Sequence, residues 1–101
     1  MTIEIKKIAD ETTITVVGRL DTTTAPALEK TIGENLDGTA YLILDMTGLE
    51  YISSAGLRVL LGAQKKMNLI GKMKLINVCE EVMDVFEMTG FADILTIEKK
   101  I

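Results

Sequence analysis

Residues 40–71 read AYLILDMTGLEYISSAGLRVLLGAQKKMNLIG, and this stretch joins a strand pattern to a helix pattern. The almost unbroken apolar run at residues 40–44 is typical of a central strand covered on both faces. The run stops at Asp45, where we expect the strand to end. From Ser53 onward apolar residues recur at helical spacing, and Gly71 follows where a helix usually ends. The stretch therefore predicts a strand followed by a helix.

The rest of the chain alternates in the same way. We expect strands at residues 2–8, 12–17, 73–78 and 94–97 and helices from Pro26 to near Gly38 and at residues 80–89. The resulting order, β-β-α-β-α-β-α-β, predicts an α/β fold in which helices pack against a mixed sheet. At 101 residues, we expect a single domain that spans residues 1–101.

Composition excludes several classes of function. The formal charge of −4 disfavours direct nucleic-acid binding. Apolar runs fall far short of the ~18 residues typical of a membrane span, and the start is not a signal peptide, so we expect a cytoplasmic protein that does not bind membranes. The chain has no histidine, and Cys79 is its single cysteine, which leaves no Ser-His-Asp triad and no disulfide. We expect a binding protein with no cofactor and no metal, rather than an enzyme.

Three polar features should converge at the carboxyl edge of the sheet, where binding sites of α/β proteins gather. Asp21 follows the second strand, Asp45 follows the third, and Ser53 and Ser54 open the second helix. A serine at a helix start most often serves as a cap, and both aspartates could be turn residues. An enzyme that uses Asp21, Asp45 and Ser54 is the competing interpretation. The chain has neither a Walker-type loop nor a Gly-x-Ser-x-Gly elbow to support it.

Longer motifs are more specific than these single residues. The chain contains Gly18-Arg19-Leu20-Asp21, Thr24-Ala25, Leu44-Asp45, YISSAGLRVLL at residues 51–61 and FEMTGF at residues 86–91. Together these motifs closely resemble the STAS family, the domain of sulfate transporters and anti-sigma-factor antagonists. The resemblance covers residues 3–97, nearly the whole chain.

The resemblance implies a phosphorylation switch. In the family, a serine at the start of the second helix is phosphorylated by the cognate anti-sigma factor, which is itself a serine protein kinase. That serine matches Ser54, and Asp21 matches an acidic residue close to it. The unmodified protein would bind the anti-sigma factor and release the sigma factor, phosphorylation would break this complex, and a serine phosphatase would restore it. The alternative is a STAS binding module of another assembly, such as a stressosome-like or lipid-transport complex.

The neighbours of Ser54 leave some points open. The family pattern has Asp before the phosphorylated serine and Ser or Thr after it, whereas this chain has Ser53 and Ala55, which makes Ser53 a second candidate acceptor. Ala55 and Gly56 could admit a partner or let the helix pack tightly on the sheet. Thr24 and Arg58 complete the candidate partner surface, although Arg58 could simply face solvent.

Family members commonly carry a further helix after the last strand, whereas the sequence here reaches Ile101 soon after it. For this reason we expect local repacking of the nearby sheet or helix rather than a dimer interface. The sequence therefore predicts a monomer.

Overall fold

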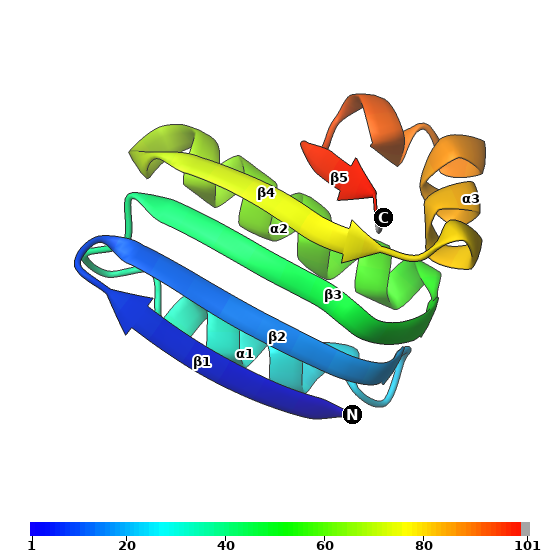
Figure 1. The fold of residues 1–101 in the computed structure, drawn as a ribbon, viewed down its shortest axis with the longest axis horizontal. Helices are drawn as coiled ribbons and strands as arrows, with labels where there is room; N and C mark the ends of the chain where they lie inside the picture. The colour runs from blue at the N-terminus through cyan, green and yellow to red at the C-terminus, as the bar shows by residue number, and fades with distance from the viewer. Residues whose placement is uncertain (100–101) are drawn as a thin grey trace.

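The computed structural model describes residues 1–99 and contains one five-stranded sheet in the order β1-β2-β3-β4-β5 (Figure 1). The elements are β1 (Thr2–Ile8), β2 (Glu11–Leu20), α1 (Ala25–Glu34), β3 (Tyr41–Ile52), α2 (Ser54–Ile70), β4 (Lys72–Val78), α3 (Glu80–Thr89), a 3-10 helix (Phe91–Asp93) and β5 (Ile97–Lys99). Strand β1 is antiparallel to β2, and all other neighbouring strands are parallel. The predicted α/β fold with a mixed sheet is confirmed.

The hydrophobic core lies between the sheet and the helices. Helices α1 and α2 cover one face of the sheet, and α3 packs beside the carboxyl end of β4 (Figure 1). Because side chains alternate along a strand, every second residue at the start of β3 enters this core. The largest fully buried side chains come from strands and helices alike: Ile14, Leu20, Leu28, Leu42, Leu44, Met46, Leu60, Met67, Leu75 and Phe86. Burial of one such side chain contributes about 1.5–3 kcal/mol.

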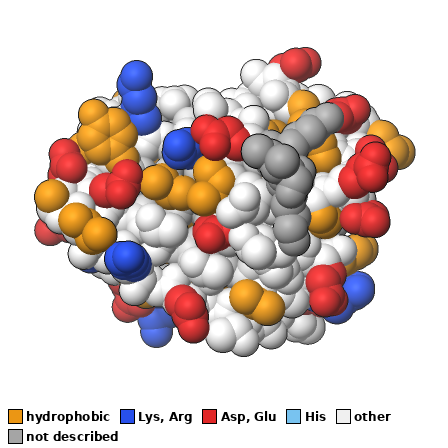
Figure 2. All heavy atoms as spheres, viewed as in Figure 1, with side chains coloured by type: hydrophobic (Ala, Val, Ile, Leu, Met, Phe, Trp, Pro, Cys, Tyr) orange, Lys and Arg blue, Asp and Glu red, His pale blue; other side chains and the backbone are white. Residues whose placement is uncertain are grey.

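The opposite face of the sheet is open, which corrects the prediction of a strand covered on both faces. Tyr41 is 49% exposed and Ile43 is only half-buried. Figure 2 views this face and shows charged, apolar and uncharged side chains mixed across it. Because one face meets solvent, the polar side chains of Asp45 and Thr47 can lie within the strand without entering the hydrophobic core. Strand β3 therefore continues to Ile52, and the predicted end at Asp45 is wrong.

The helix boundaries agree with the sequence except in α1. Helix α2 begins at Ser54 and α3 spans Glu80–Thr89, as predicted. Helix α1 ends at Glu34 rather than near Gly38, because the side-chain amide of Asn35 bonds back to the carbonyl of Thr31 at 2.7 Å. No helix within residues 1–99 is long and apolar enough to cross a membrane.

The last strand lies later in the chain than predicted. The amides of Ile94 and Leu95 both donate to the carbonyl oxygen of Phe91, at 3.0 and 2.9 Å, and this holds the segment in a turn. Strand β5 is therefore Ile97–Lys99 instead of residues 94–97. The expectation about a further helix concerns the chain beyond Lys99, outside the described residues.

Candidate functional site

The carboxyl ends of β2 and β3 meet at one edge of the sheet. Leu20 and Ile52 are register partners in this parallel pair. Just beyond them, the amide of Ser53 donates to the carbonyl oxygen of Leu20 at 2.9 Å. This bond brings the start of α2 against the end of β2, so that Ser53 lies beside the chain at Asp21. The edge predicted to carry the site thus joins one aspartate to the serine pair.

The start of α2 carries two serines and has no side-chain cap. Ser53 occupies the cap position in an extended conformation (φ −99°, ψ 176°), but its side chain makes no capping bond. Its hydroxyl oxygen is buried and has no hydrogen-bond partner in residues 1–99. Ser54 is the first helical residue and is exposed. Because no side chain caps the helix, its first amides remain available to an anion.

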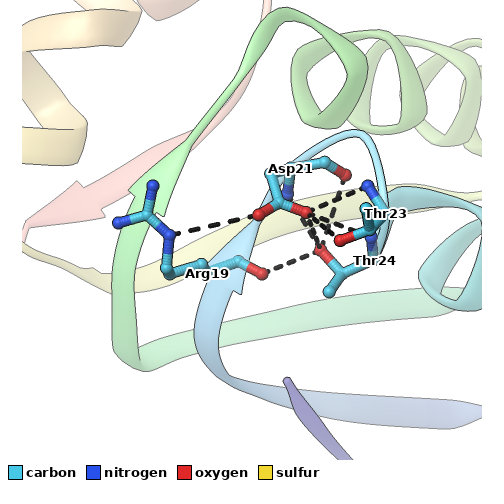
Figure 3. Close-up of polar contacts among 4 residues, drawn as sticks. All are labelled: Arg19, Asp21, Thr23 and Thr24. Atoms are coloured by element: carbon cyan, nitrogen blue, oxygen red, sulfur yellow. Dashed lines mark hydrogen bonds and ion pairs between the residues drawn. The ribbon is translucent and has the colours of Figure 1, made fainter.

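Asp21 closes the turn between β2 and α1 (Figure 3). Its Oδ1 accepts the amide and hydroxyl of Thr23, at 3.0 and 2.8 Å, and the amide of Thr24 at 3.2 Å. The Thr24 hydroxyl accepts the amide of Asp21 at 2.9 Å and donates to the carbonyl of Arg19 at 2.8 Å. The hydrogen bond from the Thr23 hydroxyl is the main cause that lowers the pKa of Asp21. Desolvation acts in the opposite direction and raises this pKa, whereas the bonds from the amides of Thr23 and Thr24 and from the Thr24 hydroxyl lower it further. A fixed negative charge therefore stands at this edge.

Arg19 supplies a positive charge that the sequence did not assign to the site. Its guanidinium carbon lies 4.1 Å from the centroid of the Tyr51 ring, and its Nε lies 4.0 Å from Oδ2 of Asp21. Arg19 and Tyr51 are register partners on β2 and β3, which is why they meet. The Arg19 side chain is 60% exposed, so its contact with Asp21 contributes little to stability. Arg19 and the exposed Tyr51 extend the surface that adjoins Ser53.

The small residues after Ser54 differ in their surroundings. A Cβ atom on Gly56 would lie 2.7 Å from Cγ of Leu20 and 2.8 Å from Cγ1 of Ile52. Gly56 therefore lets the helix pack closely on the sheet, which was one of its two predicted uses. Ala55 is half-buried, and Arg58 is exposed.

Asp45 is not part of this edge. It lies within β3 opposite Thr15 and Ile76, seven positions before Ile52. Thr15 and Leu20, the partners of Asp45 and Ile52 on β2, are five positions apart, which is roughly 17 Å at the usual rise of a strand. Its Oδ1 accepts the amide and hydroxyl of Thr47, at 3.0 and 2.6 Å, and the side-chain amide of Asn77 at 3.1 Å. The expectation that Asp45 flanks Ser54 is wrong, because the strand does not end where its polar residues begin.

The bonds to Asp45 predict an acid-dependent loss of stability. Burial alone would raise the pKa of Asp45, but the bonds from Thr47 and Asn77 outweigh it and hold the pKa below the ordinary value of 3.8. A lowered folded-state pKa stabilises the fold above the unfolded-state value, and this contribution disappears as the pH falls through the folded-state value. We expect Asp45→Ala to lower the free energy of unfolding by about 1 kcal/mol at neutral pH. The loss should shrink steadily below pH 3.8.

Urea unfolding of the wild type and the variant, at neutral pH and in steps below pH 3.8, checks this expectation. Asp84→Ala is the matched control, because Asp84 is exposed on α3. If Asp45→Ala lowers the free energy of unfolding by the same amount at every pH, the ionised carboxylate of Asp45 does not stabilise the fold and the prediction is wrong.

Fold and site define a two-layered α/β domain in which an exposed serine stands at the N-terminus of α2, at the edge where β2 and β3 end. The chain belongs to the STAS domain family, whose model matches residues 2–101.

Two curated relatives and one solved structure illustrate the likeness. BtrV of Bordetella bronchiseptica is 35% identical over 82 residues, which are 79% of this chain and 71% of BtrV. The anti-sigma-B factor antagonist of Bacillus subtilis is 27% identical over 99 residues, 97% of this chain and 91% of that protein. The Bacillus cell fate determinant SpoIIAA, solved in its phosphorylated form, superposes with a TM-score of 0.75 at 17% identity. The match covers 95% of this chain and 90% of SpoIIAA, and at this identity it supports the fold alone.

Proposed function

We propose that this protein is an anti-sigma factor antagonist, and that phosphorylation of Ser54 switches off its binding to an anti-sigma factor. The observation that carries the proposal is the exposed hydroxyl at the first helical position of α2. Membership of the STAS family and the name of the Bacillus subtilis relative support the class of function. The protein would act by binding, without chemistry or a cofactor of its own, in the cytoplasm.

Accessibility favours Ser54 over Ser53 as the acceptor. A kinase must bring the γ-phosphate of ATP within bonding distance of the hydroxyl oxygen. The Ser53 oxygen is buried, whereas Ser54 is exposed. Phosphorylation of Ser53 would first require the start of α2 to move away from the sheet, where Gly56 packs closely.

The surroundings of Ser54 suit a switch that changes binding and leaves the fold intact. A phosphate adds a charge of about −1.5 to −2. The free first-turn amides and the helix dipole of α2 stabilise an anion at this position. A partner that packs on the neutral hydroxyl would instead face a dianion for which its own surface carries no countercharge, on the same edge of the sheet as Asp21. Phosphorylation would therefore weaken the complex and leave the stability of the free protein nearly unchanged.

The implied cycle has two protein partners. A serine-kinase anti-sigma factor binds the unmodified form, releases its sigma factor and phosphorylates Ser54. A serine phosphatase then removes the phosphate and restores binding.

Intact-mass spectrometry after incubation with Mg-ATP and a kinase anti-sigma factor from the same genome tests the acceptor. We expect a single added phosphate on the wild type and on Ser53→Ala, and none on Ser54→Ala. Circular dichroism of the three proteins controls for folding. Phosphate on Ser54→Ala but not on Ser53→Ala would move the acceptor to Ser53. An unmodified wild type with every such kinase would contradict the switch.

A further inference from the structure

Strand β1 forms an outer edge of the sheet, and its far side pairs with no strand in the part of the chain that the structure describes (Figure 1). A two-residue turn joins it to β2, so that Ile8 faces Glu11. In such a hairpin the flanking residues exchange hydrogen bonds, and bonded and non-bonded pairs then alternate. The backbone N–H and C=O groups of Ile3, Ile5 and Lys7 therefore point to the open edge. Such a row of free groups is a template for another strand.

The charges of β1 are complementary to those of a second β1. In an antiparallel pair centred on Ile5, Glu4 of each chain faces Lys6 of the other, twice by symmetry. Backbone alternation makes this a non-hydrogen-bonded pair, the kind in which facing side chains are closest. Neither Glu4 nor Lys6 has an ion-pair partner among residues 1–99. The edge thus carries two charges that its own fold leaves unpaired and a second copy would pair.

The centre of this edge is apolar. Ile5 lies opposite the buried Ile14 on the face that the helices cover, yet it is 46% exposed. A second copy would bring the two Ile5 side chains together at the symmetry axis. Ile3 of each copy would then lie opposite Lys7 of the other copy, in a pair joined by backbone hydrogen bonds.

We propose that this protein forms a two-fold symmetric dimer in which β1 pairs antiparallel with β1 of a second copy, centred on Ile5. The pairing joins two sheets into one continuous sheet. Because the strand has only seven residues, the dimer is in equilibrium with the monomer that the sequence led us to expect. The inference is independent of the proposed function. Ser54 follows the carboxyl end of β3, whereas the proposed dimer contact is the open side of β1.

Charge reversal across the symmetry axis tests the register. Sedimentation velocity over a wide concentration range should show a monomer–dimer equilibrium for the wild type. Glu4→Lys and Lys6→Glu should each weaken the dimer on the order of tenfold, because like charges then face each other. The double variant Glu4→Lys/Lys6→Glu should restore wild-type affinity. Glu87→Lys, on α3, makes the same change of charge as Glu4→Lys and should leave the dimer unchanged.

Amide hydrogen exchange gives a second measurement that needs no variant. The amides of Ile3, Ile5 and Lys7 should exchange fast in dilute protein and slowly in concentrated protein. Those of Glu4 and Lys6, which bond to β2, should exchange slowly at both concentrations. A protein that stays monomeric at the highest concentration overturns the proposal. So does a dimer that withstands Glu4→Lys and leaves Ile5 unprotected.

Discussion

Ser54→Asp is expected to weaken binding of the anti-sigma factor on the order of 100-fold, with little change in the melting temperature. The substitution places a negative charge on the proposed docking surface, at the edge of the sheet that also carries Asp21. An unpaired charge in a desolvated interface costs about 2–5 kcal/mol. The fold should tolerate the same charge, because an acidic residue in the first turn of a helix interacts favourably with its dipole. Isothermal titration and thermal unfolding measure the two effects separately.

Ser54→Asn is the matched control, because asparagine has the size of aspartate without its charge. We expect its affinity for the anti-sigma factor to stay within a few-fold of wild type. Equal losses in Ser54→Asp and Ser54→Asn would show that shape, rather than charge, governs the contact. Unchanged affinity in Ser54→Asp would contradict the proposed switch.

Gly56→Ala is expected to lower the free energy of unfolding by about 1–3 kcal/mol, the usual cost of overpacking a core. The added methyl would lie 2.7 Å from Cγ of Leu20 and 2.8 Å from Cγ1 of Ile52, closer than carbon atoms pack. Both neighbours are buried, and neither atom is the free end of a side chain. The start of α2 must therefore lift from the sheet and carry Ser54 with it. Partner binding should weaken together with stability.

Gly62→Ala provides the comparison within the same helix. Its added methyl has no neighbouring heavy atom within 4 Å, so only helix propensity changes. Alanine is favoured over glycine in a helix interior by about 1 kcal/mol, and this variant should be more stable than wild type. Urea denaturation of both variants should therefore give shifts of opposite sign. Shifts of the same sign would contradict the close approach at Gly56.

The sequence was most informative where a local pattern of residues directly determines the structure. Helix α2 could be located because its apolar spacing is regular and Gly71 follows it. The edge that holds Ser54 could be predicted because parallel strands of such sheets end together. The length of β3 could not, because the pattern does not say which face of a sheet meets solvent. Asp45 was therefore interpreted as the end of a strand that in fact continues along an open face.

The contact between Arg19 and Tyr51 was also beyond sequence reasoning. It depends on the register of β2 against β3, and that register shifts between Gly18 and Arg19. An irregularity of this kind leaves no signal in the spacing of apolar residues. The resemblance to a family points to Ser54 as a candidate, but it does not show that Arg19 lies between Tyr51 and Asp21.

The order of strands in the sheet follows their order in the chain, and this has a consequence for synthesis on the ribosome. The β1–β2 hairpin can form as soon as it emerges, since its pairing is local. Each later strand must wait for its crossover helix, but it always adds to an edge that is already in place. The nascent chain thus grows its sheet in one direction and never has to insert a strand between two others.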